Sequence, residues 1–264
     1  MKLKIVLINP PIVKPSEPPA GIARLASCLR ANSISYQVID ANREGLLYLL
    51  GNAASSENSG RWTRRAHAHR EENLAALRHN YLYGNISRYG RAVADLNQLL
   101  RLAGSPYSAE ISLADYQTAE LNPVRSTDLL QSAAAPEKNP FYRYFQERLT
   151  AALAETPAYC GFSVNYLSQA ICAFAMIGFV KKQNPRQKII LGGSLITSWL
   201  KTGRRRDIFS GLVDDMVEGP GEEFLLALLG KTDGGNKAAL NYDDFAYDEY
   251  LTPGRIIPYS AASG

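Results

Sequence analysis

The chain has 264 residues, of which 46% are hydrophobic and 20% are charged, a balance typical of a globular protein with a sizeable core. A net charge of +4 is too small to indicate a nucleic-acid partner, and no apolar run reaches the about 20 residues that a membrane span requires. The N-terminus carries no apolar signal region with a small-residue cleavage site. We therefore expect a cytoplasmic protein that binds neither nucleic acid nor membrane.

The first two elements of a sheet are predicted within the N-terminal 45 residues. Residues 2–8 (KLKIVLI) form a short apolar run without helical spacing, which predicts a buried strand. Apolar residues then recur at helical spacing between Ile22 and Leu29 and predict a helix. Residues 35–40 (SYQVID) predict the second strand.

Residues 46–156 separate this region from the next strand. The apolar residues between Ile86 and Leu100 share one helical face. Because a structureless connection of this length is uncommon inside a compact domain, we predict a mostly helical insertion.

Strands and helices alternate again after the insertion. Residues 159–163, 188–191 and 214–217 predict three strands, while residues 167–182 and 222–229 predict two helices. Apolar strands that alternate with helices indicate an α/β fold with a parallel sheet. We predict a doubly wound, flavodoxin-like (Rossmann-type) sheet of five strands in the order 2-1-3-4-5.

Residues 233–264 are interpreted as a linker. It begins at Asp233-Gly234-Gly235 and ends in a strand-like run and small residues, so we expect it to lead into a second domain absent from this sequence. On this interpretation the chain binds a cofactor, and the absent part carries out the bond breaking.

Ligands of doubly wound sheets bind beyond the carboxyl ends of the strands. The loops at these positions lack both the G-x-G-x-x-G and the G-x-x-x-x-G-K-[ST] phosphate-binding motifs, which disfavours a dinucleotide or nucleoside triphosphate. The candidate binding residues in these loops are Pro10, Pro11, Ser163, Val164, Asn165, Gly192, Gly193, Ser194, Glu218, Gly219 and Gly221.

The segments GFSVN (residues 161–165) and IILGGS (residues 189–194) resemble the second half of the cobalamin-binding fold. In that fold a serine after the third strand and a Gly-Gly after the fourth line a slot for the dimethylbenzimidazole tail of the cofactor. The resemblance implies that cobalamin is the cofactor of this chain. A flat heteroaromatic tail requires a narrow apolar channel, a hydroxyl partner and missing side chains where it passes the backbone.

The histidine that ligates cobalt in better-known members of that family is missing. Residues 40–45 (DANREG) imitate the D-x-H-x-x-G motif with Asn42 in place of histidine, but they follow the second strand instead of the first. We therefore expect base-off binding, in which the dimethylbenzimidazole does not ligate the cobalt, and no bond between the protein and the cobalt. Backbone or apolar side chains would then lie at the lower face of the corrin.

Three further segments resemble the cobalamin-binding front half of cobalamin-dependent radical SAM enzymes: Asn-Pro-Pro after the first strand, residues 218–223 (EGPGEE) and the C-terminal tail. The resemblance covers residues 1–45 and about 157–264. It implies a cobalamin-binding Rossmann-like domain at 1–45 and 157–232. Its expected partner is a radical SAM domain of the same full-length chain, which would bind a [4Fe–4S] cluster and S-adenosylmethionine. Many such enzymes are methyltransferases. The present chain alone is expected to catalyse nothing.

Two other functions stay open at this point. One is a non-catalytic flavodoxin-like interaction or scaffold domain, and the other is the nucleotide-binding half of a transferase. The cysteines are too far apart for a disulfide framework or a metal knuckle, and we interpret them as buried hydrophobic residues: Cys28, Cys160 and Cys172.

Overall fold

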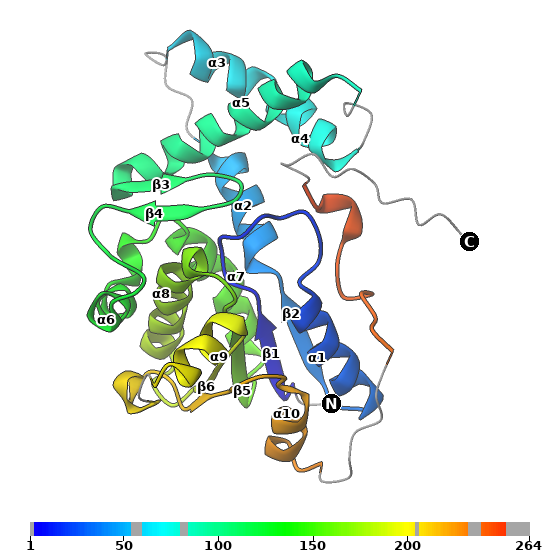
Figure 1. Cartoon of the computed structure of the whole chain (residues 1–264), viewed down its shortest axis with the longest axis vertical. Helices are drawn as coiled ribbons and strands as arrows, with labels where there is room; N and C mark the ends of the chain where they lie inside the picture. Colours follow the sequence, from blue (N-terminus) through cyan, green and yellow to red (C-terminus); the bar gives the residue numbers. More distant parts are fainter. Residues whose placement is uncertain (1–2, 54–59, 80–83, 204–205, 232–238, 252–264) are drawn as a thin grey trace.

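A computed structural model describes residues 3–53, 60–79, 84–203, 206–231 and 239–251 of the chain. Its centre is a five-stranded, all-parallel sheet with the order β2-β1-β5-β6-β7 (Figure 1). Numbered among the strands of this sheet alone, the order is 2-1-3-4-5. The predicted doubly wound α/β fold is therefore confirmed.

The sheet is built from short strands that pair in continuous register. Its inner strands are buried, because helices cover both faces, and this explains why they are apolar runs instead of alternating patterns. Leu7 of β1 lies opposite Gly161 of β5, which lies opposite Ile190 of β6. The bounds are β1 Ile5–Ile8, β2 Tyr36–Ile39, β5 Tyr159–Ser163, β6 Lys188–Gly192 and β7 Asp215–Met216.

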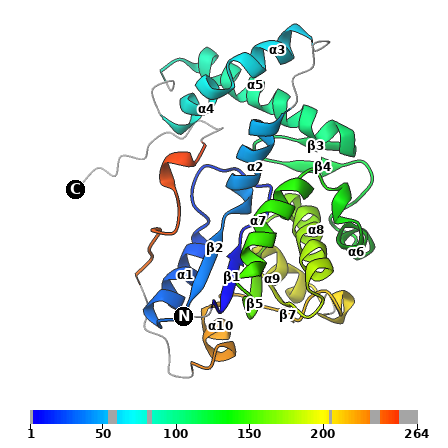
Figure 2. The same cartoon turned by 180° about the vertical axis from the view of Figure 1, so that it is seen from behind.

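Helices cover the sheet unequally on its two faces, as the opposite views in Figures 1 and 2 show. One face packs against α1 (Ala20–Ala31) and α10 (Glu222–Leu228). The other packs against α8 (Leu167–Gln183), α7, α2 and α9 in a larger apolar core. The remaining bounds on this side are α2 Ala41–Asn52, α7 Tyr142–Ala154 and α9 Ser194–Lys201.

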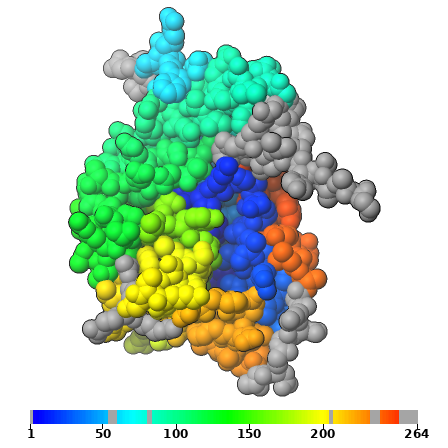
Figure 3. All heavy atoms as spheres, viewed as in Figure 1, coloured from blue at the N-terminus to red at the C-terminus, as the bar shows by residue number. Residues whose placement is uncertain are grey.

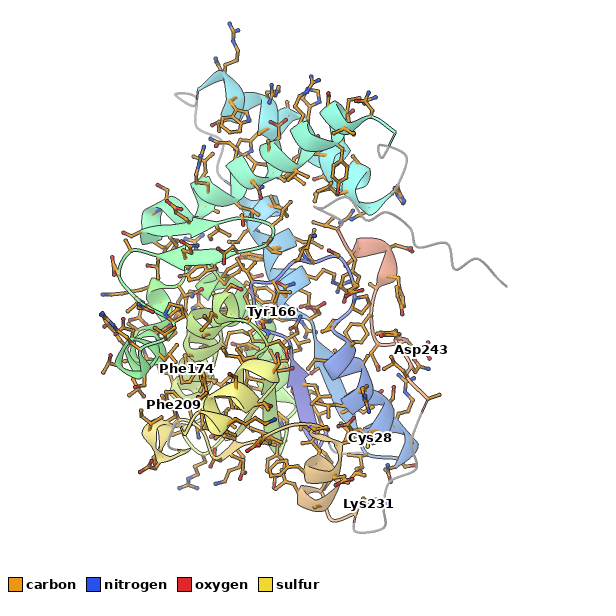
Figure 4. All side chains as sticks on the ribbon, in the orientation of Figure 1. Cys28, Tyr166, Phe174, Phe209, Lys231 and Asp243 are labelled. Carbon is orange, nitrogen blue, oxygen red and sulfur yellow. The ribbon has the colours of Figure 1, made fainter. Side chains whose placement is uncertain are left out.

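Helix α8 is the most deeply buried helix of the larger core. It is apolar all round because it lies between the sheet and helix α6 (Ser126–Ala134). A Cβ atom at Gly178 would lie 1.9 Å from the carbonyl oxygen of Ala133, so this close approach requires glycine. The ring of Phe174 of the same helix packs against the ring of Phe209 at a tilt of 55°, with 4.6 Å between the ring centroids (Figure 4).

The segment between β2 and β5 is mostly helical, as its spacing predicts. It also contains an antiparallel pair of short strands, β3 (Ala109–Ile111) and β4 (Tyr116–Thr118), which the sequence did not indicate. The helices of its outer part are α3 Arg61–Ala68, α4 Arg70–Arg78 and α5 Ile86–Gly104. Apolar side chains from these helices continue the larger core of the sheet.

Residues 239–251 pack against the edge of the sheet near α1 (Figure 4 labels Cys28 on α1 and Asp243). Arg30 of α1 forms ion pairs with Asp243 and Asp244. The backbone N–H of Leu251 donates to the carbonyl of Pro15 at 2.7 Å. This part of the predicted linker is therefore fixed to the loop after β1, while 233–238 and 252–264 lie outside the described residues.

Candidate functional site

A slot of about 390 Å³ opens between the sheet and the helix pair α1 and α10. It lies over the carboxyl halves of β1, β5 and β6, the place that ligands occupy in doubly wound sheets. In Figure 3 the atoms of α1 (blue), α9 (yellow) and α10 (orange) come together on the face turned to the viewer. The walls of the slot are mainly apolar and include Leu7, Ile22, Leu25, Ile190, Val217, Phe224 and Leu225.

Glycines form the floor of the slot. Gly161 and Ser163 of β5 share the face turned to α1, since side chains alternate along a strand. Gly192 of β6 lies opposite Ser163. At Gly161 and Gly192 the floor is bare backbone, so a flat group can lie directly on the sheet.

The predicted binding residues divide into two groups. Seven of them line the slot, namely Ser163, Asn165, Gly192, Gly193, Ser194, Gly219 and Gly221. The other four do not line it. Pro10, Pro11 and Val164 are buried behind the rim, and Glu218 is exposed.

Asn165 joins the loops that follow β5 and β6. Its Oδ1 accepts from the backbone N–H of Ser194 at 3.0 Å, and its Nδ2 donates to Ser163 Oγ at 3.3 Å. Thr197 makes the next connection, because its Oγ1 donates to the carbonyl of Gly193 and accepts from the N–H of Gly219. Thr197 lines the slot but was not among the predicted residues.

The two adjacent glycines after β6 have different roles. A Cβ atom at Gly192 would meet only Val217, at 3.8 Å, whereas a Cβ atom at Gly193 would lie 2.4 Å from the carbonyl oxygen of Val164. Gly193 also has a backbone φ of 109°, which residues other than glycine rarely adopt. Gly192 therefore leaves room in the slot, and Gly193 holds two loops of the fold together.

A second hollow of about 540 Å³ lies at the rim, above the strand ends. Gly21, Asn165 and Ser194 line both the slot and this rim pocket, so the two are contiguous. Tyr166 (Figure 4) and the loop after β1 also line it, and Ala114 reaches it from the β3–β4 turn. The rim is more polar than the slot, with amide and hydroxyl groups from Asn9, Ser16, Asn42, Asn165, Ser168 and Ser194.

Gln169 of α8 is completely buried below the rim, where it connects the loop after β1 to the loop after β5. Its Nε2 donates to Asn9 Oδ1 at 3.1 Å and to the carbonyl of Pro10 at 2.7 Å. Its Oε1 accepts from the backbone N–H groups of Asn165 and Tyr166 at 2.8 and 3.2 Å. All four bonds of one carboxamide thus fix the loops after β1 and β5 relative to each other.

Replacing Gln169 with methionine, which has nearly the same shape, is expected to lower the free energy of unfolding by about 2–4 kcal/mol. The reason is that the variant leaves buried donors and acceptors of both loops without partners. Urea unfolding measures the change. The matched control is Gln183→Met at the exposed end of the same helix, and an equal effect of both substitutions would contradict the assigned role.

Asp40 extends the buried polar network toward the C-terminal segment. Its carboxylate accepts from Asn9 Nδ2 at 2.8 Å and from the hydroxyl of Tyr250 at 2.5 Å. Arg43 lies over the Tyr250 ring and forms an ion pair with Glu249. Burial raises the pKa of Asp40, and the hydrogen bonds from Tyr250 and Asn9 oppose this only in part.

The pH dependence of stability follows from this raised pKa. The folded chain holds the Asp40 proton more tightly than the unfolded chain, so its contribution to stability is full at low pH and is lost as pH rises through the folded pKa. Asp40→Asn removes this titration and can still accept from Asn9. We expect the stability of the variant relative to the wild type, measured by urea unfolding, to increase as the pH rises above the ordinary pKa of an aspartate. Parallel curves would show that the carboxyl does not titrate abnormally.

Asn42 has a structural role. Its side chain is 2% exposed, and its Oδ1 accepts from the backbone N–H of Val13 at 2.8 Å. It therefore fixes the loop after β1.

Neither the cysteines nor the histidines form a metal site within the described residues, where no three His, Cys, Asp or Glu side chains gather in a suitable group. All three cysteines are buried, as predicted, and none of them forms a disulfide within the described residues. Burial raises the pKa of the Cys160 and Cys172 thiols to about 12. Among the described helices, none has both the length and the apolar character needed to cross a bilayer.

Comparisons of the chain with protein-family models, with curated proteins and with solved structures found no match.

Proposed function

We propose that this chain is a corrinoid-binding module that holds cobalamin base-off, with the nucleotide arm in the slot and the corrin ring over the rim pocket. The observation that carries the proposal is the position of the slot. It opens between the sheet and α1 and α10, at the ends of the strands that carry Ser163 and Gly192. Cobalamin would supply a cobalt centre that can carry a methyl group.

The shape and chemistry of the slot support this proposal. Bare backbone at Gly161 and Gly192 admits a flat ring, and apolar side chains of α1 and α10 cover its other side. Ser163 Oγ lies at the open end, within reach of Asn165. It can offer a hydroxyl hydrogen to one ring nitrogen of the arm.

The rim pocket suits the periphery of a corrin, which carries several amide groups. The amide and hydroxyl side chains of Asn9, Asn165, Ser168 and Ser194 can exchange hydrogen bonds with such groups. Among the described residues that line the slot and the rim, none is a histidine. The proposal therefore includes no imidazole ligand to cobalt.

The proposed partner is a radical SAM domain of the same full-length chain, in which S-adenosylmethionine and a [4Fe–4S] cluster would bind. The fixed position of Leu251 beside the loop after β1 supports this arrangement, because it brings the chain to the rim where the corrin would lie. The parent protein would then be an enzyme whose bond-breaking step takes place in that domain.

Equilibrium dialysis of the whole chain against hydroxocobalamin tests the proposal. We expect saturable binding of one corrinoid per chain, with the absorbance of the base-off form. A thermal-shift comparison with nucleoside triphosphates and sugar nucleotides tests the transferase alternative, since a bound ligand raises the unfolding temperature. Stabilisation by a nucleotide and none by cobalamin would reject the corrinoid assignment in favour of that alternative.

A further inference from the structure

The polar side chains that line the slot lie near the carboxyl ends of the strands or at the surface, and the rest of the lining is apolar. Ser163, Asn165, Ser194 and Thr197 lie at the carboxyl ends of the strands or just beyond them. Arg24 of α1 pairs with Glu222 of α10 at the surface, where the Arg24 side chain is 68% exposed. The other side chains of the lining come from leucine, isoleucine, valine, phenylalanine and proline.

The inner part of the floor offers no hydrogen-bonding side chain. Leu7, Gly161 and Ile190 stand side by side across three strands, two residues before the Ser163–Gly192 pair. Since a strand rises about 3.3 Å per residue, this inner row lies about 6–7 Å deeper in the sheet. Gly161 pairs with both neighbouring strands, so its backbone groups are engaged in the ladder.

Opposite this row the slot is closed by apolar side chains of two helices. Ile22 and Leu25 come from α1, and Phe224 and Leu225 come from α10. A ring that enters to this depth therefore exchanges water for hydrocarbon on its helix side, and on its sheet side for Leu7, Ile190 and the Gly161 backbone, which is already engaged in the ladder. Any polar group on its far edge loses its hydrogen bonds to water without replacement.

We infer that the slot selects the lower base of a cobamide and prefers a methylated benzimidazole to a purine. This inference rests on the proposed function. A dimethylbenzimidazole that does not ligate cobalt has one free ring nitrogen, which the hydroxyl of Ser163 can satisfy, and its two methyl groups suit the apolar inner row. Adenine carries an exocyclic amine and three unsubstituted ring nitrogens, and the slot leaves most of these unpaired.

Three corrinoids test the inference by equilibrium binding to the whole chain: cobalamin, a cobamide with adenine as its lower base, and cobinamide, which has no nucleotide arm. Cobalamin is expected to bind at least about tenfold more tightly than either of the others, equivalent to about 1.4 kcal/mol. Equal binding of cobalamin and the adenine cobamide would overturn the selection while leaving the proposed function in place. Equal binding of cobalamin and cobinamide would show that the arm does not enter the slot. Absence of binding by all three would overturn both proposals.

Two neighbouring isoleucines of β6 provide a matched pair of variants. Ile190→Thr adds a hydroxyl to the slot wall and is expected to reduce the preference for cobalamin over the adenine cobamide by about threefold or more. Ile189→Thr adds the same group on the opposite face of the sheet, in the larger core, and should leave the ratio unchanged. Val217→Thr, which has nearly the same shape as the native side chain, serves as a second slot variant if Ile190→Thr folds poorly. A ratio that stays constant in both slot variants would overturn the inference.

Discussion

Replacing Gly161 with leucine is expected to weaken cobalamin binding by about 100-fold or more, equivalent to about 2.8 kcal/mol. Gly161 lies in the middle of the slot floor, so a leucine side chain would occupy the space proposed for the lower base. The first added carbon has ordinary contacts, since a Cβ atom there would lie 3.5 Å from Leu7 and 3.6 Å from Ile5. The fold should therefore accept the change, and isothermal titration of the folded variant measures the loss.

Gly161→Ala is the matched control for this experiment. It adds only the Cβ atom, and replacing a glycine by a residue that fits its backbone conformation stabilises a protein by about 0.4–1 kcal/mol. We expect it to bind cobalamin several times more tightly than the leucine variant. If Gly161→Leu folds normally and binds cobalamin like the wild type, the lower base does not lie on this floor.

The second large effect is expected at Gly193, where alanine should lower the free energy of unfolding by about 3–5 kcal/mol. Two costs add up at this position. The backbone conformation disfavours any side chain, and the new Cβ atom would press on the backbone of Val164. Urea or thermal unfolding of the purified variant measures the change.

The neighbouring Gly192→Ala is the natural comparison. Its Cβ atom meets only Val217, at 3.8 Å, so its stability should stay close to that of the wild type. A bulky residue at Gly192 tests the slot, whereas loss of binding on substitution of Gly193 would report damage to the fold. Equal stability of the two alanine variants would contradict the distinction between these glycines.

The sheet could be predicted because its information is local in the sequence. Short apolar runs that alternate with amphipathic or apolar helices determine a parallel sheet, and the general rule for such sheets places ligands at the carboxyl ends of the strands. Ser163, Asn165 and Gly192 were found in this way. Alternation along β5 could also have identified Gly161, which lies two residues before Ser163 on the same face.

Other parts of the site depend on contacts between distant residues. Gln169 bonds to Asn9, 160 residues away, and in the sequence it is only one polar residue near the start of an apolar helix. The network from Asp40 to Tyr250 spans 210 residues. Periodicity and motif spacing do not reveal such contacts. The hydrogen bonds by which Gln169 fixes the loops after β1 and β5, and the attachment of residues 239–251, could therefore not be predicted.

The most direct test of the central claim is electron paramagnetic resonance of cob(II)alamin bound to the chain. Base-off binding without a histidine predicts a cobalt signal that has no splitting from an axial nitrogen, recorded on a complex that survives removal of free cofactor by gel filtration. A threefold nitrogen splitting on each cobalt line would show that dimethylbenzimidazole or an imidazole still ligates the metal. That result, or a protein fraction without cobalt, would contradict the account.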